Sequence, residues 1–153
     1  LNSEEGSRYE WICLDSFSEM AEVCLAVEKK KEKNPMRAYM TTQENMSSMV
    51  RAFRDMPNRN VVITAKLERS QDQETGAMLF APSCPGNKLA QSLPYFFDIV
   101  LALRTQKDDE DNIRRFLQTQ SDQQWSAKDR SGKLNMYESP DLIELHNKIM
   151  EVH

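Results

Sequence analysis

The sequence lacks long hydrophobic runs, closely spaced cysteines and an excess of positive charge. Its 153 residues contain no apolar run of about 18 residues, so we expect no membrane span. The opening LNSEEGSRYE is acidic and polar, which is not the pattern of a signal peptide. The formal net charge of -4 gives no overall attraction to nucleic acid or to an anionic membrane, so any nucleic-acid contact would need a local basic patch.

Cysteine is scarce as well. Cys13, Cys24 and Cys84 are odd in number and widely spaced, which disfavours a disulfide framework or a metal site. Cys13 and Cys24 lie in apolar patterns, where a free cysteine behaves as a small core residue. This use of cysteine is typical of a protein in a reducing cytoplasm.

The rest of the chain alternates between strand-like and helix-like segments. The run YEWICL over 9–14 predicts a buried strand of a parallel sheet, and VVITA over 61–65 predicts a central strand. Helical spacing predicts one helix from Phe17 into the charged run 29–33, and a second helix that begins at the capping box Thr41–Glu44. The later elements are expected to be a polar loop over 69–86, a short helix over 87–93, a strand over 96–104, a charged turn over 107–112, a hairpin of 114–120 with 124–128, and a helix over 140–150. This order predicts a single α/β domain with a layered sheet that is mainly parallel at first.

Asp15 and Ser16 directly follow the first expected strand. A hydrophobic strand that delivers an aspartate to its carboxyl end is the arrangement of a Walker B motif. Such an aspartate can hold the water shell of a Mg²⁺ ion whose other ligands are nucleotide phosphates. The alternative is structural, because either residue would serve equally well as a helix N-cap.

The segment VVITAKLER carries polar residues out of a buried strand. Lys66, Glu68 and Arg69 follow the strand immediately before the long polar stretch. Polar groups at this position can sense a phosphate and pass its state to the loop behind them. An ordinary solvated strand end is the alternative, and on this segment alone it is the favoured one.

Lys128 and Arg130 form a third signal, in WSAKDRSGK. Residues two apart on an extended segment point the same way, so the two cations project together. This suits a polyphosphate, because arginine can clamp it with two hydrogen bonds. Equally, the charges could guard a hairpin edge against aggregation.

Taken in order, these segments resemble a known family. The chain is similar to the phage RecA-like ATP-binding proteins of the P-loop NTPase class, which include the single-strand-annealing recombinases, in WICLDSFSEMAE, RAFRDMPNRNVVITAKLER, PGNKLAQSLPYFFDIVLALR and QTQSDQQWSAKDRSG. The resemblance runs from Tyr9 to about Leu145, and WSAKDRSG and PGNKLAQSLPYFFD are its most specific parts. It implies a partial RecA-like core, with a mainly parallel sheet flanked by helices and a C-terminal hairpin.

The resemblance implies ATP and Mg²⁺ as cofactors. Asp15 would be the Walker B aspartate, which holds Mg²⁺ through water, with Ser16 beside the metal. Lys66 and Glu68 would occupy the sensor position. The sensor in RecA itself is glutamine, so the sensor chemistry of this chain departs from that pattern.

The resemblance also assigns a role to the two later cations. Lys128 and Arg130 would match the Lys-x-Arg finger that reaches the γ-phosphate bound by the next subunit. A finger of this kind acts only in a homo-oligomer, as a filament or a ring.

Single-stranded DNA is the implied partner, with single-strand-binding protein as a second one, in the cytoplasm of a bacterial host. The stretch 69–86 would be the DNA-facing loop. The candidate DNA contacts are Arg69, Phe80 and Lys88. Phe80 would stack on a base, although a buried phenylalanine that anchors the loop is an equal alternative.

One departure from the family is clear. The phosphate-loop motif G-x-x-x-x-G-K-[ST] does not occur in the 153 residues, and the family carries it before the Walker B strand. We therefore expect a fragment, inactive alone, of a DNA-dependent ATPase of phage recombination. The alternatives are a non-enzymatic nucleic-acid-binding or interaction module with a RecA-like fold, and a RecA-fold helicase or helicase loader.

Overall fold

The computed structural model describes residues 5–71 and 76–151. The chain forms two compact units: unit 1 comprises Leu1–Glu68 and Pro82–Phe96, and unit 2 comprises Arg69–Ala81 and Phe97–His153. Each unit buries its own apolar residues. Within the described residues, every helix is too short or too polar to cross a membrane.

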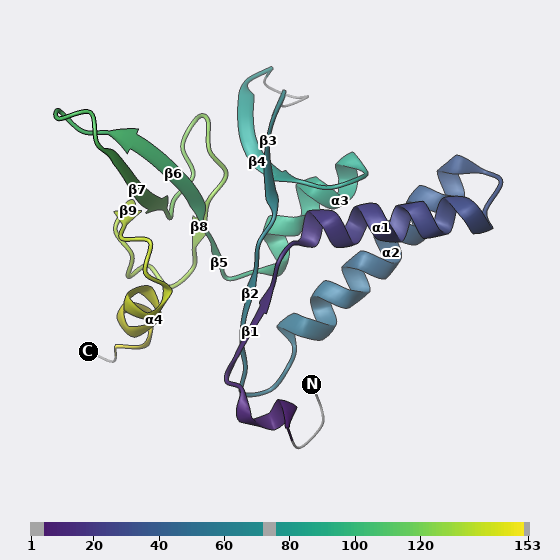
Figure 1. Ribbon diagram of the computed structural model, residues 1–153, viewed down its shortest axis with the longest axis horizontal. Coiled ribbons are helices and arrows are strands. Elements are labelled where there is room, and N and C mark those ends of the chain that lie inside the picture. The colour runs from purple at the N-terminus through teal and green to yellow at the C-terminus, as the bar shows by residue number, and fades with distance from the viewer. Residues whose placement is uncertain (1–4, 72–75, 152–153) are drawn as a thin grey trace. The chain divides into compact units, whose positions relative to one another are not determined.

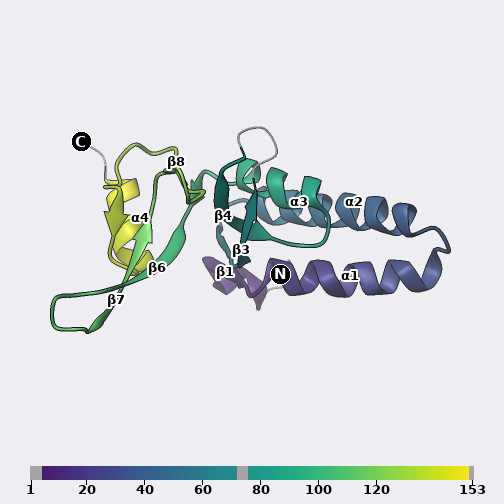
Figure 2. The ribbon, with the colours of Figure 1, turned by 90° about the horizontal axis from the view of Figure 1, so that it is seen from above.

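A short parallel sheet and two long helices form the framework of unit 1. The strands β1 (Trp11–Leu14) and β2 (Asn60–Ile63) pair in parallel. The helices α1 (Phe17–Lys31) and α2 (Pro35–Arg54) connect them and lie side by side (Figures 1 and 2). Parallel neighbours need such a crossover, because the chain must return to the starting edge before it runs in the same direction again.

Both long helices begin at side-chain caps. Ser16 Oγ accepts a hydrogen bond from the Glu19 amide at 3.3 Å, and Asn34 Oδ1 accepts one from the Met36 amide at 2.9 Å. Pro35 occupies the start of α2, where a missing N–H is tolerated. The prediction that this helix begins at Thr41–Glu44 is therefore wrong, because the Asn-Pro pair starts it earlier.

The core of unit 1 is apolar. Besides the sheet and the two long helices, unit 1 contains η1 (Gly6–Arg8), α3 (Asn87–Ser92) and η2 (Leu93–Phe96). Its buried apolar residues are Ile12, Phe17, Ala21, Leu25, Ala38, Met46, Val50, Leu89 and Leu93. Cys13, which we expected in the core, is exposed, and Cys24 is half-buried. The pleat of β1 explains this, because Ile12 takes the buried side and its neighbour faces away.

Unit 2 is built on antiparallel strands and one helix. The hairpin β6 (Ala102–Lys107) and β7 (Ile113–Gln118) pairs further with β9 (Tyr137–Glu138). Separately, β5 (Ile99–Val100) pairs antiparallel with β8 (Lys128–Asp129). The helix α4 (Leu142–Met150) begins at the cap Asp141. The core of unit 2 contains Leu117, Leu134 and Leu145, with Ile99, Leu101 and Ile149 packed against them.

The polar stretch that we expected to be a loop is partly strand. β3 (Lys66–Gln71) and β4 (Met78–Ser83) form a two-stranded sheet, and the boundary between the units falls inside both strands. The expectation of a continuous loop over 69–86 is therefore wrong. β3 is polar, and β4 is a short apolar run that includes a proline, so neither has the regular alternation that predicts a strand. Each satisfies its backbone hydrogen bonds by pairing with the other.

The expected hairpin also changes partners. The strand predicted over 114–120 is β7, but it pairs with β6 rather than with 124–128, and the charged turn 107–112 joins the two. The strand predicted over 96–104 is divided into β5 and β6. Among the described pairs whose direction is defined, β1–β2 is parallel and the three in unit 2 are antiparallel. The other predicted helices, near 17–31, 87–93 and 140–150, are confirmed.

Candidate functional site

Asp15 and Thr64 meet at the carboxyl ends of the parallel strands of unit 1. Leu14 lies opposite Ile63 in the sheet, so the residues that follow these two, Asp15 and Thr64, also lie next to each other. Thr64 Oγ1 donates to Asp15 Oδ1 at 2.5 Å, and the Thr64 carbonyl accepts from the Phe17 amide at 2.8 Å. The aspartate is exposed, and its peptide bond to Ser16 is cis. The carboxylate is thus oriented by a neighbouring strand while it stays accessible to a ligand.

The N-cap of α1, which was the alternative role for Asp15, is its neighbour Ser16. Ser16 Oγ accepts the Glu19 amide, so the first turn of α1 is capped without Asp15. Ser16 therefore lies beside the candidate metal ligand, with its hydroxyl used by the helix. This division leaves the Asp15 carboxylate with Thr64 as its neighbour at the strand ends.

A chain of hydrogen bonds ties the expected sensor residues to the start of α1. The Lys66 amide donates to Ser18 Oγ at 2.9 Å, and Ser18 Oγ donates to the Ser83 carbonyl. Ser83 Oγ in turn donates to the Glu68 carboxylate. The structure therefore brings Asp15, Ser16, Lys66 and Glu68 to one end of the β1–β2 pair.

Sequence reasoning missed three members of this site: Ser18, Thr64 and Ser83. The position of Thr64 carried a usable signal, because it follows β2 as Asp15 follows β1. Ser18 and Ser83 are 65 residues apart, so their contact had no local signal. Ser18 is buried, and a buried hydroxyl must find hydrogen-bond partners within the protein.

In unit 2, the two candidate finger cations lie at the end of strand β8: Lys128 belongs to the strand and Arg130 follows it. The Arg130 amide donates to the Asp98 carbonyl at 3.2 Å, and Arg130 Nη1 lies 3.0 Å from Asp98 Oδ1. Asp129, between the cations, accepts from the Ser131 amide at 2.8 Å and from the Leu134 amide at 3.0 Å. The Asp129 carboxylate thus fixes the turn that follows the two cations.

The environment of Asp129 favours its charged form. Burial would raise the pKa of this carboxyl group, but hydrogen bonds from Ser131, Leu134 and Gly132 outweigh burial and place the pKa below its ordinary value. Asp129 is therefore ionised near neutral pH. Gly132 has a φ of 67°, a backbone conformation that glycine adopts without strain, and so completes the same turn.

The candidate DNA contacts differ in their surroundings. Arg69 is exposed on β3, and Lys88 is exposed on α3 in the other unit. Phe80 is half-buried, and its ring stacks on Trp125 with a centroid distance of 4.3 Å and an interplanar angle of 14°. The structure therefore shows Phe80 packed within unit 2, as the anchoring alternative predicted, and leaves the proposed base contact as a prediction.

The donor set at Asp15 is compatible with Mg²⁺. A carboxylate and a hydroxyl are hard oxygen donors, and Mg²⁺ commonly takes one or two carboxylates and completes its shell with water and phosphate. Within the described ranges, no group of three or more His, Cys, Asp or Glu residues could hold a metal ion. The 153 residues also lack the phosphate-loop motif, so phosphates would need backbone donors from another segment.

Comparison with known proteins adds one finding. A family model described as an AAA domain matches residues 2–131, which include the strand ends of unit 1 as well as Lys128 and Arg130. We found no match to this chain among curated proteins or solved structures.

Proposed function

The chain belongs to the AAA domain family, and from this premise we propose that it forms the Walker B and finger region of an ATPase that acts on single-stranded DNA. The family supports nucleotide binding of the P-loop NTPase kind. The finer assignment, to a RecA-like protein of phage recombination that anneals single strands, rests on the sequence resemblance. ATP with Mg²⁺ would be the cofactor pair.

The observation that carries the proposal is the contact between Asp15 and Thr64. Ligands of open α/β sheets bind at the carboxyl ends of the strands, where this pair lies. Asp15 would hold a water ligand of Mg²⁺, and Thr64 would keep its carboxylate turned toward the strand ends. When bound, Mg²⁺ supplies charge neutralisation at the phosphates.

Lys66 and Glu68 would report the state of the nucleotide. Ser18 Oγ accepts a hydrogen bond from the Lys66 amide at 2.9 Å, and Ser83 is hydrogen-bonded to both Ser18 and Glu68. A displacement near Asp15 would therefore reach the beginning of β3 through α1. This supports the sensor role without assigning a proton transfer to either side chain.

Lys128 and Arg130 would act across a subunit boundary in a filament or ring. We propose that the phosphate loop comes from a segment outside these 153 residues, and that the chain is one partial RecA-like domain. Alone, the chain should bind ATP very weakly, because the backbone amides and lysine of that loop are not part of it. Micromolar ATP binding by this chain in calorimetry would contradict this proposal.

The absence of the phosphate-loop motif favours a second candidate function. A non-enzymatic nucleic-acid-binding module would use Arg69, Phe80 and Lys88 without hydrolysing ATP. The two candidates differ in one measurement: the ATPase hydrolyses ATP faster with single-stranded DNA, whereas the module binds DNA and never hydrolyses ATP. A RecA-fold helicase or loader would add strand separation or loading to the first result.

The decisive experiment uses the protein that carries this chain together with a phosphate loop. Arg130→Ala should lower DNA-stimulated ATP hydrolysis by about 10³-fold, because a finger arginine stabilises the transition state from the neighbouring subunit. Asp15→Asn should impair the metal site of its own subunit. A mixture of the two inactive variants should regain activity, since some interfaces then pair an intact Asp15 with an intact Arg130.

Arg114→Ala is the matched control. Arg114 is an exposed arginine of unit 2 that pairs with a carboxylate, the half-buried Asp108, at 2.9 Å, as Arg130 pairs with Asp98. It should hydrolyse ATP at the parent rate. Normal hydrolysis by Arg130→Ala would remove the finger assignment, as would a joint loss of activity and thermal stability.

A further inference from the structure

Strand β4 and the segment that leads into β8 are joined at one point. The Phe80 amide donates to the Gln124 carbonyl at 2.6 Å, and the Ser126 amide donates to the Phe80 carbonyl at 2.9 Å. These bonds form an isolated parallel bridge between Phe80 and Trp125, whose rings are also stacked. Backbone and side chain of the same two residues thus connect segments that are more than forty positions apart in the printed sequence.

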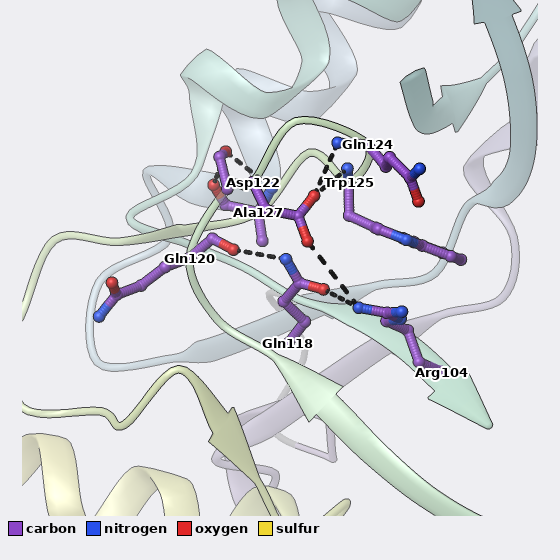
Figure 3. Close-up of polar contacts among 8 residues, drawn as sticks. Arg104, Gln118, Gln120, Asp122, Gln124, Trp125 and Ala127 are labelled. Carbon is purple, nitrogen blue, oxygen red and sulfur yellow. Dashed lines mark hydrogen bonds and ion pairs between the residues drawn. The ribbon is translucent and has the colours of Figure 1, made fainter. Parts of the chain in front are cut away.

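Arg104 contacts Trp125, the second ring of this stack. Its guanidinium lies 4.5 Å from the Trp125 ring centroid and donates to Gln118 Oε1 at 2.6 Å (Figure 3). Gln118 is completely buried and passes its own amide hydrogen to the Gln120 carbonyl at 2.8 Å. An arginine on an aromatic face gains both stacking and charge–quadrupole attraction, so Trp125 has a defined position.

The segment between Trp125 and the cations is itself hydrogen-bonded. Asp122 Oδ1 accepts the Gln124 and Trp125 amides, each at 2.7 Å (Figure 3). Ser121 Oγ accepts the Ala127 amide at 3.1 Å and donates to the Ala127 carbonyl at 2.6 Å. A movement of Trp125 therefore displaces a closed turn rather than a flexible chain.

Asp122 is charged in this turn. Partial desolvation would raise the pKa of its carboxyl group, but hydrogen bonds from Gln124 and Trp125 and the charge of Arg104 outweigh it, and the pKa lies below its ordinary value. The Asp122 and Arg104 charges approach to 3.9 Å. The ionic contact between Asp122 and Arg104 is therefore retained near neutral pH.

We infer that the Phe80–Trp125 contact couples the β3–β4 ribbon to Lys128 of β8 and to Arg130 directly after it, so that a single strand of nucleic acid bound at the ribbon repositions both cations. Trp125 is a positioning residue in this scheme. The inference rests on the proposed function. It adds a route within unit 2 that runs from Phe80 through Trp125 and Ala127 to Lys128.

The test measures the ratio of ATP hydrolysis with and without oligo-dT, in the protein that carries this chain and its phosphate loop. Trp125→Leu keeps a smaller apolar side chain and removes the ring, whereas Trp125→Phe keeps a ring to stack on Phe80. Trp125→Leu should lower the stimulation ratio by about fivefold or more, the range of typical allosteric coupling. Its DNA-free rate should stay near the parent value, because Ser121 still holds Ala127. Trp125→Phe should retain most of the stimulation.

A second measurement uses the ring as a reporter. When Trp11 and any tryptophan outside these 153 residues are replaced by phenylalanine, Trp125 is the remaining tryptophan, and its emission should change when oligo-dT binds. Unchanged stimulation in Trp125→Leu would overturn the coupling, as would a parallel loss of DNA-free rate and thermal stability. Unchanged emission on DNA binding would also overturn it.

The controls separate this inference from the proposed function. Arg130→Ala should lose hydrolysis with and without oligo-dT, whereas Trp125→Leu should lose only the difference between the two conditions. If Arg130→Ala behaves as expected and Trp125→Leu keeps full stimulation, the finger role of Arg130 is supported and the coupling through Trp125 is contradicted. If oligo-dT does not stimulate the parent protein, both the DNA-dependent ATPase function and the coupling through Trp125 are contradicted.

Discussion

Arg130 is held by Asp98 at two points, through its backbone amide at 3.2 Å and through a guanidinium nitrogen 3.0 Å from the carboxylate. The backbone hydrogen bond continues the β5–β8 pairing by one residue and does not depend on the Asp98 side chain. The ionic contact can be removed, because both side chains are mostly exposed, 66% for Arg130 and 76% for Asp98. A finger that must reach a phosphate would have to leave this carboxylate.

Asp98→Asn should therefore change stability little and should not slow hydrolysis. An exposed ion pair contributes about 0–1 kcal/mol, so the free energy of unfolding should fall by no more than this. Urea denaturation measures the stability, and steady-state hydrolysis measures the rate. A loss of activity comparable to that of Arg130→Ala would mean that Asp98 holds the arginine in its working position.

Gln118→Met should destabilise the chain by about 1–3 kcal/mol, because the half-buried guanidinium of Arg104 loses a charged hydrogen bond. The volume is nearly kept, while Arg104 loses the acceptor at 2.6 Å. Gln123→Met is the matched control, since Gln123 is exposed in the same segment. Urea denaturation should separate the two variants. Equal stability would show that water replaces Gln118.

Glu138→Gln should reduce the acid dependence of stability. Burial would raise the pKa of Glu138, but the hydrogen bonds from Lys148, at 2.7 Å, and from Asn135 hold it below its ordinary value. Such a carboxylate stabilises the fold above its unfolded pKa, near 4.5, and this stabilisation is lost as the pH falls through the folded pKa.

The variant should be less stable than the parent protein near neutral pH by about 1–2 kcal/mol. The difference should shrink as the pH is lowered below 4.5. Denaturation curves over that pH range measure it, with Glu110→Gln as the control on an exposed turn. A difference that is constant with pH would exclude the charge of Glu138 as its source.

Cys84 should react slowly with iodoacetamide in the folded chain. Burial raises the pKa of its thiol to about 11, whereas Cys13 is exposed on β1. At mildly alkaline pH the thiolate fraction of Cys84 should be roughly 100-fold below that of an ordinary thiol. Mass spectrometry after brief alkylation should find Cys13 modified first, and urea should remove the difference. Equal labelling in the folded state would contradict the burial of Cys84.

The sequence predicted the elements whose signals are local. The apolar spacing after Phe17 marked α1, and the β-branched run 61–65 marked β2, which ends at Ile63, because each pattern reflects burial on a regular element. The alternation at 128–130 predicted one extended segment for both cations, whereas β8 contains Lys128 and ends before Arg130. These features depend on neighbours within a few residues, so they could be recognised without knowledge of the fold.

Elements that depend on distant partners were missed. β3 is polar and β4 is a short apolar run that includes a proline, and each is a strand because the other pairs with it. The pairing of β7 with β6 rather than with 124–128 is set by the turn at 108–112, where Asp108 accepts the Glu110 and Asn112 amides. In the site, the Ser18–Ser83 contact joins residues far apart in sequence, and no local pattern encodes it.

The division of the chain limits how it can be dissected. The backbone passes from one unit to the other three times, after Glu68, after Ala81 and after Phe96, so neither unit is a continuous stretch of polypeptide. A peptide that begins at Phe97 would carry Trp125 and both cations but leave Phe80 behind. Expression of the C-terminal half as an autonomous module would therefore yield a tryptophan without its stacking ring, and any study of the finger by truncation would also change the element that holds it.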